Sequence, residues 1–144
     1  VILYRACLHD QDNIVPMWFQ EVISSYVSVL NECPYSYANH WSNVRHLVGY
    51  EQRADEIEAA LQNRTPDAAF DGKELEALRY AEKLTCTPAK MQEADIVPMR
   101  AAGWDDGEIL EINQIICYFN YANRLLNGLG VTTEGDVVAY SKKD

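Results

Sequence analysis

Apolar residues recur at three- and four-residue steps through most of the 144-residue chain. This spacing places them on one face of an α-helix, whereas a strand would need strict alternation. Two such helices are predicted on either side of a tight turn at residues 31–32, the first over 16–30 and the second over 33–48. Proline fits the first turn of each helix, and Gly49 fits the end of the second.

The same periodicity predicts the remaining elements. Asp105 and Asp106 are expected to cap the last helix, and Thr87 is expected to cap the helix before it. Only residues 137–140 suit a short extended piece, and no segment shows sustained alternation. The predicted class is therefore all-α, and short connections favour an antiparallel bundle. The further helices are expected over residues 1–8, 51–61, 71–87, 87–102 and 107–126.

The last predicted helix, residues 107–126, is apolar around most of its circumference. A helix of this kind is buried on all sides, either in the centre of a domain or in a subunit interface. Its apolar residues are Ile109, Leu110, Ile112, Ile115, Ile116, Cys117, Phe119, Leu125 and Leu126.

Length and composition predict one ordinary globular domain over residues 1–144, without a linker or internal repeat. The net charge of −10 argues against nucleic acid and against an anionic membrane surface, because both are bound through Lys and Arg. No apolar run approaches the roughly 20 residues that span a bilayer, and no signal peptide is recognised. The expected partner is a small molecule or another copy of the chain.

The four cysteines are widely spaced and form no Cys-x-x-Cys pair or metal-ligand pattern. His40 and His46 point to different faces of a helix, so neither a metal nor a cofactor is expected. Without a secretory signal, reduced thiols in the cytoplasm are the expectation. Free cysteines pack as small apolar residues, which is the role expected for most of Cys7, Cys33, Cys86 and Cys117.

Ser36 and His40 are one turn apart on the second helix, with Cβ atoms about 5–6 Å apart. Cys33 lies two turns from His40, about 10 Å along the axis, too far for a direct hydrogen bond. Glu21 lies at a similar depth on the preceding antiparallel helix, which brings it beside His40. A carboxylate there would orient the imidazole, which would serve position 36 as a base.

Cys33 has a separate source of activation at the start of the second helix. Unpaired backbone N–H groups and the helix dipole favour the thiolate, which lowers a cysteine pKa below its free value of about 8.5. The alternative is that Cys33 is an inert helix-start residue, Ser36 a first-turn hydroxyl and His40 a packing histidine. Residue types alone leave both interpretations open.

The spacing of Glu21, Cys33 and His40, with the lead-in at residues 27–31, resembles a known signature. It is similar to the active-site pattern of alkylhydroperoxidase D-like proteins in the carboxymuconolactone decarboxylase superfamily. The resemblance extends over nearly the whole chain. Similarity to the peroxidase-related branch of that family is carried by residues 75–85, 101–104, 118–125 and 128–131.

The resemblance implies an all-helical subunit that assembles into a trimer or hexamer. It also implies reduction of hydroperoxides with a thiol reductant, an antioxidant activity, at a site made of Glu21, Cys33, Ser36 and His40. In the family the cysteine nearer the histidine attacks the peroxide, the other cysteine resolves it to a disulfide, and the histidine and glutamate relay the proton.

This sequence departs from the family at two positions. Ser36 occupies the place of the attacking cysteine, and Asn39 replaces a histidine common in the peroxidase-related branch. A serine hydroxyl cannot be oxidised to a sulfenic acid or close a disulfide. The two-cysteine cycle is therefore unavailable to this sequence, and the peroxidase activity is expected to be altered or lost.

Three functions stay open. Cys33 could work alone with an external thiol, or the site could have decayed. His40 and Glu21 could instead transfer a proton on a small carboxylated substrate, as in a lyase or isomerase. An arginine beside His40, with Arg45 and Arg124 as candidates, would favour that alternative. A serine hydrolase is disfavoured because no Gly-x-Ser-x-Gly motif is present.

Overall fold

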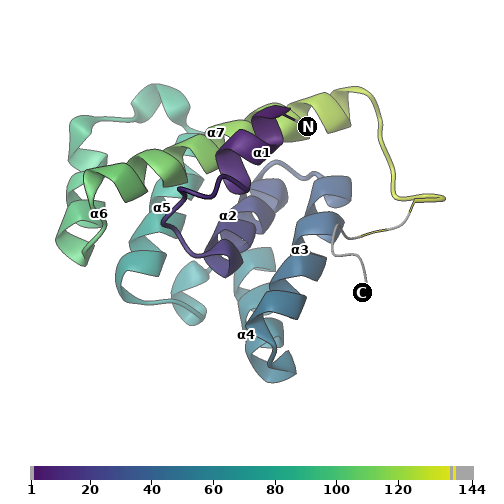
Figure 1. The fold of residues 1–144 in the computed structure, drawn as a ribbon, viewed down its shortest axis with the longest axis horizontal. Helices are drawn as coiled ribbons and strands as arrows, with labels where there is room; N and C mark the ends of the chain where they lie inside the picture. The colour runs from purple at the N-terminus through teal and green to yellow at the C-terminus, as the bar shows by residue number, and fades with distance from the viewer. Residues whose placement is uncertain (1, 137, 139–144) are drawn as a thin grey trace.

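The computed structural model describes residues 2–136 and residue 138, and in this part of the chain all regular elements are helical (Figure 1). The all-α, single-domain prediction is confirmed. The expected extended piece at 137–140 lies outside the described residues except for Val138. The α-helices are α1 (Ile2–Leu8), α2 (Met17–Leu30), α3 (Pro34–Val48), α4 (Glu51–Gln62), α5 (Gly72–Cys86), α6 (Val97–Ala102) and α7 (Asp106–Gly128). Short 3-10 helices are η1 (Pro66–Ala68), η2 (Pro88–Lys90) and η3 (Glu93–Asp95).

Helices α2 and α3 form the predicted antiparallel pair. Glu32 makes the turn with a left-handed φ of 51°, and the N–H of Cys33 donates to the carbonyl of Ser28 at 2.9 Å. Pro34 then starts α3, where its missing N–H costs nothing. Gly49 ends α3 with a φ of 71°, a conformation that glycine adopts without strain.

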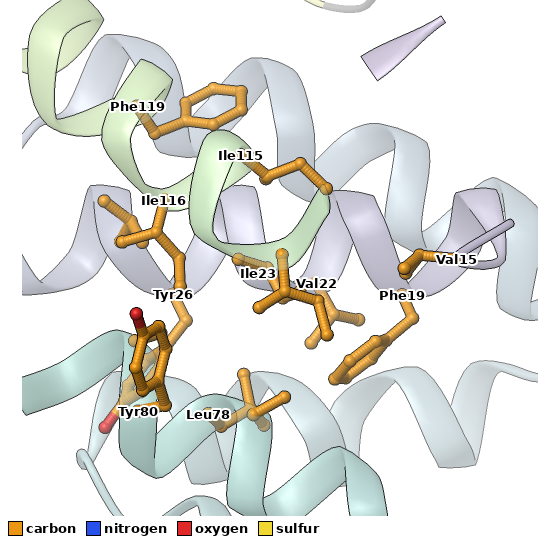
Figure 2. Close-up of a cluster of buried hydrophobic side chains, with 14 of the residues drawn as sticks. Val15, Phe19, Val22, Ile23, Tyr26, Leu78, Tyr80, Ile115, Ile116 and Phe119 are labelled. Atoms are coloured by element: carbon orange, nitrogen blue, oxygen red, sulfur yellow. The ribbon is translucent and has the colours of Figure 1, made fainter. Parts of the chain in front are cut away.

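Helix α2 is the centre of the core. Every residue from Phe19 to Leu30 except Val29 is buried. Figure 2 shows its apolar side chains lying between α7 on one side and α5 on the other. This packing compensates the low helix propensity of its β-branched residues. The labelled core side chains are Val15 just before α2, Phe19, Val22, Ile23 and Tyr26 from α2, Leu78 and Tyr80 from α5, and Ile115, Ile116 and Phe119 from α7.

Helix α7 buries one face and exposes the other. Ile112, Ile115 and Ile116 are fully buried, whereas Leu110 is 58% and Leu125 49% exposed. Of the two predicted alternatives, burial of this helix in the centre of the domain is therefore wrong, and its burial in a subunit interface stays a prediction. The short helix α1 lies along α7 (Figure 1) and covers part of it.

The helix predicted over residues 87–102 is wrong. The chain makes the two short helices η2 and η3 there, and only α6 is α-helical. Proline at 88 and 98 removes backbone donors and suits only the first turn of a helix, so the segment is broken into short pieces. Thr87 does not cap a helix, because its hydroxyl donates back to the carbonyl of Lys83 at 3.2 Å.

The cap predicted for the last helix is present. Asp105 accepts a hydrogen bond from the backbone N–H of Glu108 at 2.8 Å, and the Glu108 carboxylate accepts from the N–H of Asp105 at 2.9 Å. This reciprocal arrangement satisfies two N–H groups at the start of α7. None of the helices in the described residues is long and apolar enough to cross a membrane.

Candidate functional site

Glu21 and His40 form a buried pair between α2 and α3. Glu21 Oε2 lies 2.6 Å from His40 Nδ1, and the two side chains are 2% and 7% exposed. Asn43 donates from Nδ2 to Glu21 Oε1 at 3.2 Å, so both carboxylate oxygens have a partner. The predicted contact between Glu21 and His40 is confirmed. A carboxylate held in this way orients the ring.

His40 lines a pocket of about 320 Å³ between α1, α3 and α7. This volume is at the lower end of the range for small-molecule sites. Phe119 meets the His40 ring edge-on, with ring centres 4.5 Å apart. The charged, amide, hydroxyl and imidazole side chains that line the pocket are those of Arg5, Ser36, Asn39 and His40. The aromatic and aliphatic side chains that line it are those of Tyr4, Tyr35, Tyr118, Phe119, Tyr121, Ala122, Leu125 and Leu126.

The second ring nitrogen of His40 is left for a ligand. Glu21 occupies Nδ1, and no other described residue is hydrogen bonded to Nε2. With a neutral ring and its proton on Nδ1, Nε2 is an acceptor; with a charged ring it is a donor. The arrangement can therefore take a proton from a bound molecule or give one to it.

Ser36 is hydrogen bonded to Ser28, not to His40. The two hydroxyl oxygens are 2.8 Å apart, and the described structure has no hydrogen bond between Ser36 and His40. Both residues line the same pocket. The structure therefore brings His40 and position 36 to one cavity without the direct base–hydroxyl contact that the sequence predicts.

Cys33 lies at a second pocket, of about 270 Å³, together with Ser28 and Tyr37. It does not line the His40 pocket and is only 2% exposed. Burial raises the pKa of the Cys33 thiol above its ordinary value, and the opposing effect of the Ser36 backbone N–H is smaller. The predicted lowering of this pKa is wrong, because desolvation of the thiolate outweighs the helix start.

Solved structures share this arrangement of helices. One is an uncharacterized peroxidase-related protein from Silicibacter sp. TM1040, with a TM-score of 0.81 and 26% sequence identity; the match covers 91% of this chain and 66% of that one. A second is an uncharacterized peroxidase-related protein from Ralstonia eutropha JMP134, described as an alkylhydroperoxidase AhpD core. It has a TM-score of 0.77 and 22% identity, with 88% of this chain and 64% of that one covered. The chain has the AhpD-like fold.

The predicted resemblance to peroxidase-related, AhpD-like proteins is thus confirmed in the fold. The chain spans slightly less than two thirds of the length of these two proteins, 66% and 64%. No protein-family model matches it, and no curated protein is significantly similar to it.

Within this AhpD-like fold the arginine at the pocket is Arg5, not Arg45 or Arg124. Arg45 pairs with Asp55, and Arg124 donates to the Asn120 side chain at 2.7 Å. Arg5 lines the His40 pocket, and its side chain forms no ion pair with another described residue. It is thus a cation free to meet a ligand.

Sequence reasoning missed three contributors to the site. Asn43 follows His40 by one helical turn, a spacing that could have indicated its contact with Glu21. Ser28 stands in the lead-in that carries the resemblance, but its bond to Ser36 crosses from α2 to α3. Arg5 gave no signal, because α1 reaches the pocket only through tertiary packing. Among the described residues, no group of three or more His, Cys, Asp and Glu could hold a metal ion.

Proposed function

We propose that the chain is an AhpD-like enzyme in which the Glu21–His40 pair exchanges a proton with a small organic molecule bound beside Ser36. The observation that carries the proposal is the 2.6 Å contact between Glu21 Oε2 and His40 Nδ1 at the wall of the pocket. A pair in this geometry is the usual form of a general acid–base catalyst.

The pocket favours proton transfer without a thiol. Arg5 supplies a positive charge for a carboxylate, and aromatic and aliphatic side chains supply walls for the rest of the molecule. None of the described residues that line this pocket is a cysteine. The proposed reaction class is therefore a lyase or isomerase step, in which His40 removes a proton from a carbon near the carboxylate and returns one at the product.

This proposal is tested by deuterium incorporation. Small carboxylated lactones and β-keto acids would be incubated with the protein in D₂O and followed by proton NMR. Exchange catalysed by the wild type should be lost in His40→Gln and retained in His46→Gln, which changes an exposed histidine of the same helix. Equal exchange in His40→Gln and wild type would exclude His40 as the acid–base group.

Hydroperoxide reduction is the second candidate, favoured by the peroxidase-related names of the two structural neighbours. In that reaction the Cys33 thiolate attacks the terminal oxygen of the peroxide, the O–O bond breaks, and Cys33 becomes a sulfenic acid. The leaving alkoxide takes a proton from water, because His40 lines the other pocket. One external thiol then forms a mixed disulfide with release of water, and a second restores Cys33.

The burial of Cys33 predicts that this reaction is slow in the wild type. Ser36→Cys would place a thiol in the His40 pocket and should raise peroxide turnover at least tenfold over wild type. Cys86→Ser, which removes an exposed thiol, is the control. If Ser36→Cys gains nothing and Cys33 traps no sulfenic acid, peroxide reduction is excluded.

The proposal extends to assembly and compartment. The exposed apolar residues of α7, Leu110, Tyr121 and Leu125, suit a contact between copies of the chain in a trimer or hexamer. All four cysteines are free thiols, which suits the reducing cytoplasm.

A further inference from the structure

Ser28 stands at the centre of a buried polar cluster behind the His40 pocket. Its Oγ is 2.8 Å from the carbonyl of Ser24, 2.8 Å from Ser36 Oγ and 3.4 Å from Asn123 Oδ1. Ser28 and Asn123 are fully buried, and Ser36 is 3% exposed toward the pocket that it lines. The cluster joins α2, α3 and α7 at one point.

Counting hydrogens fixes the direction of these bonds. A hydroxyl has one hydrogen to donate and two lone pairs that accept. The carbonyl of Ser24 can only accept, so Ser28 must give its hydrogen there. The contact between Ser28 and Ser36 then needs a hydrogen from Ser36, because two oxygens at 2.8 Å without one would repel each other.

Asn123 is the third hydrogen-bonding neighbour of the Ser28 hydroxyl. Its Nδ2 is buried and has no acceptor among the described residues, while its Oδ1 faces a Ser28 hydroxyl that has no hydrogen left. A half turn of the amide brings Nδ2 to Ser28, where it can donate to the hydroxyl oxygen. Ser28 then donates once and accepts twice, which uses its full capacity.

We propose that Ser28, held by Asn123 and the Ser24 carbonyl, is a positioning residue that takes the Ser36 hydrogen and turns the Ser36 lone pairs toward the pocket. Ser36 is then an acceptor toward the bound molecule and not a nucleophile. Together with a neutral His40, whose Nε2 also accepts, it selects a ligand that donates a hydrogen bond, such as an alcohol, hydroperoxide or enol.

This inference rests on the proposed use of the pocket but needs no turnover. Neutron diffraction from crystals of the chain in D₂O locates the two deuterons directly. The Ser36 deuteron is expected between the two hydroxyl oxygens, and the Ser28 deuteron on the line to the Ser24 carbonyl. A Ser36 deuteron that points to His40 or into the pocket would overturn the inference.

Calorimetric binding of two unreactive probes tests the consequence. 2-Phenyl-2-propanol donates a hydrogen bond and its methyl ether does not; the wild type is expected to bind the alcohol about five- to tenfold more tightly, the ratio for one hydrogen bond. Ser28→Ala should reduce that ratio severalfold, and Ser28→Thr, which keeps the hydroxyl, should restore it.

Ser25→Ala is the matched control. Ser25 is on the same helix and fully buried, but its hydroxyl has no hydrogen-bond partner among the residues that the structure describes. The control should keep the wild-type ratio. Equal binding of the two probes by wild type, or an unchanged ratio in Ser28→Ala, would contradict the proposal. Because no reaction is measured, loss of deuterium exchange in His40→Gln can be judged separately.

Discussion

Glu21 is a buried carboxylate whose two oxygens are both used, one by His40 and one by Asn43. A buried charge is tolerated only when its hydrogen-bonding capacity is met. The amide of Asn43 therefore supports the pair without touching a ligand. This makes Asn43 a residue whose effects on stability and on the proposed proton transfer should appear together.

Asn43→Leu is expected to lower the free energy of unfolding by about 1–3 kcal/mol, because it leaves Glu21 Oε1 buried without a donor. Denaturant unfolding measures the change. Asn63→Ala, which removes an exposed asparagine at the end of α4, is the control and should change little. A neutral effect of Asn43→Leu would show that water replaces the amide.

At Cys33 the structure predicts slow chemistry. Because burial raises its pKa, only a small fraction of the thiol is ionised at pH 7. Alkylation by iodoacetamide should be much slower at Cys33 than at the exposed Cys86, and it should rise about tenfold per pH unit until the raised pKa is passed. Mass spectrometry of digested protein gives both rates. Equal rates at pH 7 would mean that α3 opens readily at its start.

At the scale of the element, the start of α7 depends on one reciprocal cap. Asp105→Ala removes the acceptor for the Glu108 N–H and should cost about 0.5–2 kcal/mol of stability. Asp71 stands at the same position before α5 but makes no side-chain cap bond. Asp71→Ala is therefore the matched control. Similar losses in the two variants would mean that helix-start charge, not the cap bond, matters.

The elements could be predicted because helical periodicity is local. Residues close in sequence were enough to predict the α2–α3 turn and the cap at Asp105. The rise per residue of a helix was enough to predict that Glu21 and His40 lie at similar distances from that turn. The prediction of one helix over residues 87–102 failed because two prolines break a helix that the spacing of apolar residues would otherwise favour. The burial of Cys33 and the position of Arg5 depend on which helices pack over them. Tertiary packing of this kind cannot be predicted from the local spacing of residues.

At the scale of the whole molecule, two buried acids, Cys33 and Tyr26, and one half-buried acid, Tyr37, make stability depend on pH. Burial raises the pKa of Cys33, Tyr26 and Tyr37 above their ordinary values. The unfolded chain therefore loses these protons first, so the stability present below about pH 9 falls as pH rises further. Thermal unfolding between pH 8 and pH 10.5 should show a falling midpoint. A flat profile would mean that these groups ionise in the folded chain as easily as in the unfolded one.

The exposed face of α7 makes assembly testable. Leu110→Glu should shift the mass measured by light scattering toward that of the monomer, because a charge in an apolar interface is not solvated. Val97→Glu, at an exposed apolar residue of α6, should leave the mass unchanged. A wild-type monomer would reject the proposed trimer or hexamer.

The His40 pocket is formed by helices that are far apart in the sequence, α1, α3 and α7. Glu21 and His40 are 19 residues apart in the sequence. The carboxylate of Glu111, by contrast, accepts a hydrogen bond of 2.9 Å from the N–H of Ile14, which is 97 residues away in the sequence. Loop-closure entropy makes the short connection the faster one to form. During synthesis the Glu21–His40 hairpin can thus assemble before α7 has been made, and the binding pocket exists only after α7 arrives and α1 settles against it.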